Sequence, residues 1–149
     1  MNNKSFKTIV VPVKAKREIE KEESKFKVAL IAHDTKKADM LAFAAKNSDI
    51  LKKCSLIATK ATGRLINNKT DLEVKEMMSG PEGGDLQIGG LVASEEIDLV
   101  IFLRDPLAKQ PHDPDIAALM KVCDVHDIPL ATNLSSAEIL LKGAAINLV

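Results

Sequence analysis

Short apolar runs alternate with segments of helical period along most of the chain, and this alternation restricts the possible folds more than any other feature. Runs typical of strands occupy 27–32, 55–59, 72–78, 98–103 and 128–132, and segments of helical length lie between them. Strands that alternate with helices form right-handed crossovers and parallel sheets. The sequence therefore predicts an α/β fold: a single doubly wound, mainly parallel five-stranded sheet with helices on both faces.

Local patterns refine two of the later elements. In the helix that follows the third strand, we expect Leu86, Ile88 and Leu91 to face inward. The last helix is expected to end at Gly143, because glycine commonly closes helices. Residues 145–149 are then expected to form a short final strand.

The first 26 residues differ in composition from the rest of the chain. Residues 8–13, TIVVPV, could add a strand at a sheet edge, and the charged stretch that follows is expected to be a solvated helix or a linker. We therefore divide the chain into an N-terminal extension, residues 1–26, and one domain, residues 27–149. No apolar run approaches the length of a membrane span, so we expect a cytoplasmic protein.

The balance of charge argues against several classes of partner. Lys and Arg total 21, Asp and Glu total 21, and the chain contains no Trp or Tyr. A net charge of zero leaves no electrostatic footprint for nucleic acid or an anionic membrane, and few rings are available for base stacking. Cys54 and Cys123 lie far apart without CxxC spacing, so free thiols are expected.

Polar residues collect where each predicted strand ends. The carboxyl ends of parallel strands meet at one edge of the sheet, and ligands bind in the crevice outside that edge. The sequence therefore predicts a site at this edge, built from the segments that begin at His33-Asp34, Thr59, Ser79, Arg104-Asp105 and Thr132-Asn133.

The segment TKATG, residues 59–63, offers chemistry suited to a small anion. Thr59 and Thr62 supply hydroxyl groups, the N–H groups of a helix N-terminus attract phosphate, and Lys37 could supply the matching positive charge. The segment is not a P-loop, since G-x-x-x-x-G-K-[ST] is absent. The simpler alternative is that both threonines are helix caps and that Lys37 is a solvated lysine.

The glycine-rich stretch SGPEGGDLQIGG, residues 79–90, places Asp85 at a strand-to-helix turn. Asp85 is either an N-cap or a general base held against a substrate carbon, with the glycines clearing space for the ligand. Glu82 is expected to face solvent. His112, which lies between two prolines, could polarise a carbonyl or carry a proton, or it could simply hydrogen-bond within a helix entry turn.

No metal ion or cofactor is expected. The three histidines show no ligand spacing such as His-x-x-x-His, and the G-x-S-x-G nucleophile motif is absent. Chemistry at the predicted site is therefore expected to depend on side chains and main-chain amides alone.

Several longer motifs together resemble one family. ALIAHDTKK, ATKATG, MMSGPEGGDLQIGGLV, DLVIFLRDPLAKQPHDPDIAALMKVC and IPLATNLSSAEIL resemble methylglyoxal synthase, from about Lys27 to about Gly143. The combination of SGPxGGDxQIG with DPLxxxPHDPD is highly specific. The resemblance implies a methylglyoxal synthase-like domain and a carbon–oxygen lyase that converts dihydroxyacetone phosphate to methylglyoxal and inorganic phosphate.

The resemblance also implies roles for individual residues. Asp85 matches the catalytic base, and His112 is expected to act in catalysis as well as in binding. The expected substrate-binding residues are His33, Lys37, Thr59, Lys60, Ala61, Thr62, Ser79, Gly80 and His112, and the expected supporting acidic residues are Asp34, Asp105 and Asp115. The resemblance further implies a homohexamer that is inhibited by inorganic phosphate.

The chain departs from the family pattern at two points, and two other functions are considered beside the lyase. Ala61 stands where the family often has threonine, and the chain ends at Val149, before the longer tail of some members, which carries an arginine that reaches a neighbouring subunit. One alternative is a non-catalytic methylglyoxal synthase-like regulatory domain that binds a phosphorylated effector and has no need of Asp85 or His112. The other is a small α/β isomerase that acts on the same substrate.

Overall fold

The structure is a computed structural model and describes residues 25–148. The predicted edge strand at 8–13 lies outside the described residues. Those residues form one sheet whose neighbouring strands all pair in parallel, in the order β3-β2-β1-β4-β5. The strands are β1 (Lys27–Ala32), β2 (Ser55–Ala58), β3 (Val74–Glu76), β4 (Leu99–Leu103) and β5 (Leu130–Ala131). The predicted five-stranded α/β sheet is confirmed, and every pairing in it is parallel.

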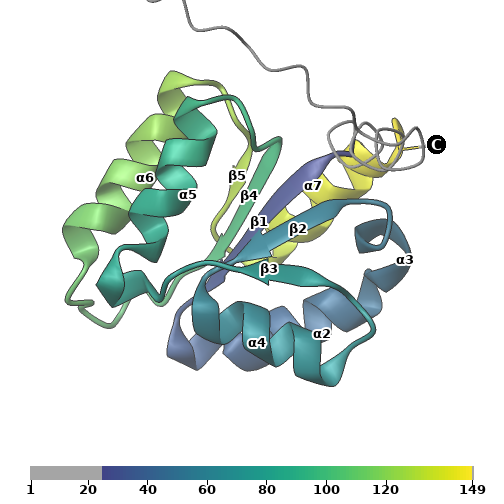
Figure 1. Ribbon diagram of the computed structural model, residues 1–149, viewed down its shortest axis with the longest axis horizontal. Coiled ribbons are helices and arrows are strands. Elements are labelled where there is room, and N and C mark those ends of the chain that lie inside the picture. Colours follow the sequence, from purple (N-terminus) through teal and green to yellow (C-terminus); the bar gives the residue numbers. More distant parts are fainter. Residues whose placement is uncertain (1–24, 149) are drawn as a thin grey trace, which may run out of the picture.

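Helices cover both faces of this sheet (Figure 1). They are α2 (Lys37–Lys46), α3 (Ser48–Leu51), α4 (Lys60–Lys69), α5 (Gly84–Ala93), α6 (Asp113–Val125) and α7 (Leu134–Ala145), with the short 3₁₀ turns η1 (Asp34–Lys36) and η2 (Gly80–Glu82) before α2 and α5. Helices α5 and α6 pack on one face, and α2, α3, α4 and α7 pack on the other. Across residues 25–148, no helix combines the length and the apolar character that a membrane crossing requires.

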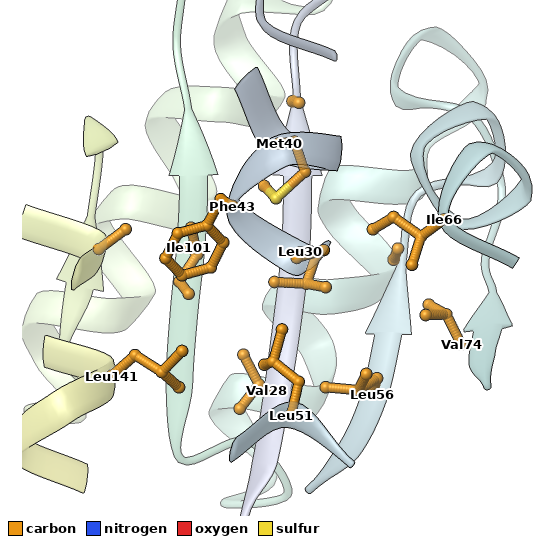
Figure 2. Packing of buried hydrophobic residues seen from close by; sticks show 14 of the residues in the cluster. Val28, Leu30, Met40, Phe43, Leu51, Leu56, Ile66, Val74, Ile101 and Leu141 are labelled. Carbon is orange, nitrogen blue, oxygen red and sulfur yellow. The ribbon is translucent and has the colours of Figure 1, made fainter. Parts of the chain in front are cut away.

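The central strands divide their side chains between two cores. Leu30 of β1 lies beneath Met40 and Phe43 of α2 (Figure 2), whereas its neighbour Ile31 belongs to the core under α5 and α6. Strand β4 is buried along its whole length, and Phe102 in that strand also faces α5 and α6. Successive side chains of a strand point to opposite faces, so a strand covered on both sides must be apolar throughout. This explains the unbroken apolar run of β4.

The structure corrects the predicted inward face of α5. Ile88 is buried as expected, but Leu86 is 51% exposed, and Leu91 is only half-buried. The buried stripe of the helix consists of Gly84, Asp85, Ile88, Gly89 and Val92. These positions follow the i, i+3, i+4 spacing of one helix face. The prediction for Leu86 is wrong because two glycines and a carboxylate, rather than a leucine, occupy the face toward the sheet.

The end of the chain also differs from the expectation. Helix α7 continues through Gly143 to Ala145, and residues 146–148 follow without forming the expected final strand. Gly143 does not adopt the left-handed conformation that commonly closes helices. Among the glycines in residues 25–148, only Gly83 has this conformation. Leu148 instead packs, partly buried, against the core.

Both cysteines are free and buried. Burial raises the pKa of the Cys123 thiol to about 11 and also raises the pKa of the Cys54 thiol. A thiol reacts as its thiolate, so neither side chain is suited to act as a nucleophile at neutral pH.

Candidate active site

A small cavity lies at the carboxyl ends of the strands, where the segments after β1, β2 and β3 meet the loop between β4 and α6. Its volume is about 130 Å³, well below the roughly 300–1,000 Å³ of pockets for drug-sized ligands. The chain winds outward from β1 to β3 and then crosses back to β4, so the sheet changes direction between β1 and β4, and a ligand crevice is expected there. The cavity is lined by Ile31, Ala32, His33, Asp34, Lys37, Thr59, Ala61, Ser79, Gly80, Pro81, Asp85, Gln110 and His112.

A larger hollow of about 650 Å³ lies away from these residues. It is bounded by the beginnings of β2 and β3 and by the end of α4, and its lining includes Leu56, Asn67 and Val74. These are the amino ends of the strands, opposite the edge where ligands bind in such sheets. Size alone therefore does not identify the site, and we assign the chemistry to the smaller cavity.

Glycines in the η2–α5 segment allow the chain to turn tightly beside the cavity. Gly83 has φ of 105°, a conformation that side chains other than glycine rarely adopt. A Cβ atom on Gly84 would overlap the main-chain carbonyl of Met78. A Cβ atom on Gly80 would lie 2.6 Å from Nε2 of His112. The glycines therefore clear space for a tight turn and for a histidine ring.

Asp85 lies in the first turn of α5 and is fully buried, with 0% of its surface exposed. It is not the N-cap, because Gly83 occupies that position. Neither carboxylate oxygen has a hydrogen-bond partner within residues 25–148. Burial raises the pKa of Asp85, Asp115 raises it further, and His112 acts in the opposite direction. A buried carboxyl group without hydrogen bonds is costly and is typical of a functional site.

His112 lies within ion-pair distance of this carboxylate. Its Nε2 lies 3.2 Å from Oδ2 of Asp85, and its side chain is 9% exposed. The pair has the distance of an ion pair without hydrogen-bonded geometry. The His112 carbonyl accepts from the N–H groups of Asp115 and Ile116, which anchors the residue at the start of α6. Both His112 and Asp85 line the cavity.

His33 presents a defined nitrogen to the cavity. Its Nδ1 accepts a hydrogen bond of 2.8 Å from the main-chain N–H of Asp105, so the ring proton of the neutral form resides on Nε2. That Nε2 is buried and has no partner among the described residues. Burial lowers the pKa of His33, and the nearby His112 and Arg104 lower it further. A neutral Nε2–H donor therefore lines the site.

The lining of the cavity also carries groups suited to an anion. Lys37 Nζ is held by the carbonyl of Ala32 at 3.0 Å and by the carboxylate of Asp34 at 2.7 Å. Lys37 in turn lowers the pKa of Asp34. Thr59 is the N-cap of α4, but its hydroxyl makes no capping hydrogen bond. The first N–H groups of a helix have no partner inside the helix. That of Lys60 donates to the Met78 carbonyl at 3.3 Å, which leaves those of Ala61 and Thr62 for an anion.

Four predicted site residues do not line the cavity. Thr62 is fully buried in α4, and its hydroxyl has no partner among residues 25–148. Lys60 is exposed. The carboxylate of Asp105 is engaged with Thr35 and Leu107. Asp115 raises the pKa of Asp85 through its charge. The other predicted residues are brought together.

Sequence reasoning missed four residues that line the cavity: Ile31 and Ala32 at the end of β1, and Pro81 and Gln110. Gln110 lies two residues before His112 in the same loop, so the signal was its proximity to a candidate residue. Its main-chain N–H is bonded to Oδ2 of Asp113 at 3.2 Å, which fastens the loop to the first turn of α6. Within residues 25–148, no group of three or more His, Cys, Asp or Glu residues could hold a metal ion.

Comparisons with known proteins point to one family. The family model of the MGS-like domain matches residues 39–132. A methylglyoxal synthase of Thermoanaerobacterium thermosaccharolyticum is 59% identical over 116 residues, which cover 78% of this chain and 87% of that protein. A methylglyoxal synthase of Bacillus subtilis (strain 168) is 56% identical over 116 residues, covering 78% and 85%. A crystal structure of methylglyoxal synthase from Elizabethkingia anophelis NUHP1 superposes with a TM-score of 0.74 at 44% identity, covering 78% of this chain and 77% of that one.

Proposed function

The chain belongs to the methylglyoxal synthase family and is a lyase, and we propose that it converts dihydroxyacetone phosphate to methylglyoxal and inorganic phosphate with Asp85 as the catalytic base. One observation supports this role above all. Asp85 is a fully buried carboxylate without a hydrogen-bond partner in the described residues, and it lines a small cavity that also holds groups suited to phosphate.

The first step is removal of a proton. Dihydroxyacetone phosphate has a carbonyl between one carbon that bears a hydroxyl and another that bears the phosphate. Asp85 takes a proton from the hydroxyl-bearing carbon, and the electron pair of that C–H bond forms an enediolate. The raised pKa of Asp85 makes the carboxylate a stronger base than an ordinary aspartate, and a positioned base typically contributes about 10²–10⁴-fold to the rate.

Histidines are suited to stabilise the negative charge that develops on oxygen. His33 offers a neutral Nε2–H, and the ring of His112 lies beside Asp85. Donors that are already oriented need no rearrangement during the reaction, and one such donor typically contributes about 2.7–4 kcal/mol. We assign this role to His112 and His33 together, because their ring centroids are 6.2 Å apart.

The second step is loss of phosphate, and its outcome depends on orientation. If the C–O bond to phosphate stands perpendicular to the enediolate plane, the π electrons form a C=C bond to the phosphate-bearing carbon as the C–O pair leaves with phosphate. The hydroxyl group on the other end passes its proton to the enediolate O⁻, and the electron pair of that O–H bond forms the aldehyde C=O. If that bond lies in the plane, elimination is suppressed and reprotonation gives an isomerase. The groups proposed to hold the phosphate out of plane are Lys37, the Thr59 hydroxyl, the main-chain N–H groups of Ala61 and Thr62, and Ser79 and Gly80. The enol released then tautomerises to methylglyoxal.

The assembly and its regulation are further parts of the proposal. We propose a homohexamer that inorganic phosphate inhibits, acting in the cytoplasm. Three exposed apolar side chains near the cavity support self-association: Met78 is 48% exposed, Leu86 is 51% exposed and Leu107 is 96% exposed. Sedimentation of the purified protein is expected to give a hexamer mass, and a monomer at micromolar concentration would contradict this proposal.

A phosphate-release assay with dihydroxyacetone phosphate tests the function and separates it from its rivals. The proposal expects stoichiometric inorganic phosphate and methylglyoxal. An isomerase would form glyceraldehyde phosphate without releasing phosphate. A regulatory domain would bind the phosphorylated compound without converting it. Either of these two results would overturn the proposal.

Replacing His112 by glutamine is expected to lower kcat more than it raises KM. Glutamine keeps a donor of similar reach but lacks the ring that lies 3.2 Å from Asp85, so transition-state stabilisation should fall by about 10²-fold. Steady-state kinetics of phosphate release measure the two constants. An increase in KM with unchanged kcat would make His112 a binding residue only.

A further inference from the structure

Asp105 does not direct its carboxylate into the cavity. Oδ2 accepts a hydrogen bond of 2.8 Å from the hydroxyl of Thr35, and Oδ1 accepts one of 3.0 Å from the main-chain N–H of Leu107. Both hydrogen bonds lower the pKa of Asp105, and the one from Thr35 has the larger effect. The carboxylate is therefore a fixed, ionised acceptor that shapes its own loop. Its part in the site must come from another of its atoms.

That atom is the main-chain nitrogen. The N–H of Asp105 donates to Nδ1 of His33 at 2.8 Å, while the N–H of His33 donates to the carbonyl of Leu103 at 3.1 Å. Thr35 lies only two residues after His33, in η1. The contacts therefore close a ring that runs from the His33 imidazole through Asp105 to the Thr35 hydroxyl and back along the chain. This ring joins the carboxyl ends of the adjacent strands β1 and β4.

We infer that Thr35 is a positioning residue, which holds the Asp105 N–H against Nδ1 of His33 and so keeps the Nε2–H tautomer of His33 facing the cavity. A neutral histidine donates from one ring nitrogen and accepts at the other, and the partner of one nitrogen decides which is which. Without this hydrogen bond the ring can carry its proton on Nδ1. Nε2 would then present a lone pair to an anionic substrate.

The surroundings of the ring make this choice of tautomer matter. The charged and titratable groups that act on His33 are His112, Arg104, Asp105 and Lys37. Burial disfavours a second proton on the ring, and so do His112, Arg104 and Lys37. The ring therefore stays neutral, and a neutral ring offers the cavity either a donor or an acceptor. Edge-on packing against Phe102 at 5.2 Å keeps the ring from turning freely.

The test compares three variants of the full chain. Thr35→Val removes the hydroxyl and keeps the β-branched shape, Thr35→Ser restores the hydroxyl, and Thr70→Val is the matched control. The Thr70 hydroxyl also donates a 2.8 Å hydrogen bond, to the carbonyl of Ile66 at the far end of α4. Each variant is examined by phosphate-release kinetics and by ¹H–¹⁵N correlation spectra of the imidazole rings. The chain holds only three histidines, so the ring signals can be assigned by single substitution.

Thr35→Val is expected to raise the population of the Nδ1–H tautomer of His33 and to lower kcat/KM by about tenfold, the scale of one hydrogen bond. Thr35→Ser is expected to return both values to within about twofold of the unsubstituted chain. Thr70→Val is expected to leave the His33 signals and kcat/KM unchanged. An unchanged tautomer in Thr35→Val, an equal loss in Thr70→Val, or no rescue by serine would each overturn the inference.

A second variant separates charge from geometry. Asparagine at position 105 can still accept a hydrogen bond from the Leu107 N–H and can donate one to the Thr35 hydroxyl. Asp105→Asn should therefore retain the His33 tautomer and lose less than about threefold in kcat/KM. Asp105→Ala, which can do neither, should lose about tenfold. If Asp105→Asn and Asp105→Ala lose kcat/KM equally, the charge of Asp105 matters rather than its hydrogen bonds, and the inference is overturned. Only the kinetic readout rests on the proposed function. If the protein releases no phosphate, the imidazole spectra still decide the tautomer.

Discussion

Replacing Asp85 by asparagine is expected to abolish turnover while leaving ligand binding intact. Asparagine has nearly the same shape but accepts no proton from carbon, so phosphate release should fall by about 10²–10⁴-fold or more. Inorganic phosphate should still bind, because the groups assigned to it are other residues of the lining and do not include Asp85. Phosphate-release kinetics and calorimetric titration with phosphate measure the two effects. Near-normal turnover in Asp85→Asn would remove Asp85 from the role of base.

The same substitution is expected to increase stability at neutral pH. The folded-state pKa of Asp85 is raised above its ordinary value. A group of this kind contributes stability below its unfolded-state pKa and loses that contribution as the pH rises through its folded-state pKa. At neutral pH the ionised, buried carboxylate therefore destabilises the fold, and Asp85→Asn removes this cost. The free energy of unfolding should be higher for the variant at pH 7, and the difference should shrink as the pH falls toward the ordinary carboxyl range.

These two effects of Asp85→Asn are linked by one physical cause. A carboxylate without hydrogen-bond partners is reactive because no hydrogen bond stabilises its charge, and it is costly to the fold for the same reason. A stabilised but inactive variant would support this account. A variant that is both inactive and much less stable would indicate that Asp85 serves mainly to hold the fold together.

Replacing Gly84 by alanine is expected to damage both the fold and the site. The added Cβ would overlap the main-chain carbonyl of Met78, and backbone atoms do not move aside as the end of a side chain can. Overpacking of this kind typically costs about 1–3 kcal/mol. Any shift of the first turn of α5 also moves Asp85, the next residue, and a displacement of about 1 Å can cost about 10²-fold in rate.

Gly90 in the same helix provides the matched control. A Cβ on Gly90 would meet nothing within 4 Å, and its backbone is not in the left-handed region. Gly90→Ala should therefore stabilise the protein by about 0.5–1 kcal/mol, the usual gain of alanine over glycine inside a helix. Urea unfolding of both variants measures the free energies. Equal midpoints for Gly84→Ala and Gly90→Ala would contradict the close approach of Gly84 to Met78.

Most of the architecture could be predicted from the sequence, because it follows from local periodicity. The unbroken apolar run of β4 and the helical spacing in α2 and α6 are each visible in one short segment. Their order along the chain then limits the topology, since crossovers between parallel strands are right-handed. The predicted N-terminal edge strand lies outside the described residues and stays a prediction.

The meeting of the site residues could be predicted for a related reason. His33, Thr59 and Ser79 each follow a parallel strand, and parallel strands end at a common edge of the sheet. Their convergence on one cavity therefore required only the right order of elements. The roles of these residues, in contrast, stay proposals.

Other features depended on how elements rotate and pack, and no local pattern determines that. Leu86 faces outward because α5 turns glycines and Asp85 toward the sheet, although a leucine would ordinarily be expected inside. Asp105 serves His33 with its main-chain N–H rather than with its carboxylate, a choice of atom that the residue type does not reveal.

The sequence by itself therefore determined the type and order of the elements and the edge at which the polar residues collect, because these follow from periodicity and from the geometry of parallel strands. The tertiary structure alone decided which atoms face the cavity: the buried oxygens of Asp85, the Nε2 of His33 and the ring of His112. Burial leaves the Asp85 oxygens without partners, and a hydrogen bond between segments some 70 residues apart, from the Asp105 N–H to Nδ1 of His33, leaves Nε2 to the cavity. Such contacts exist only once the chain has folded.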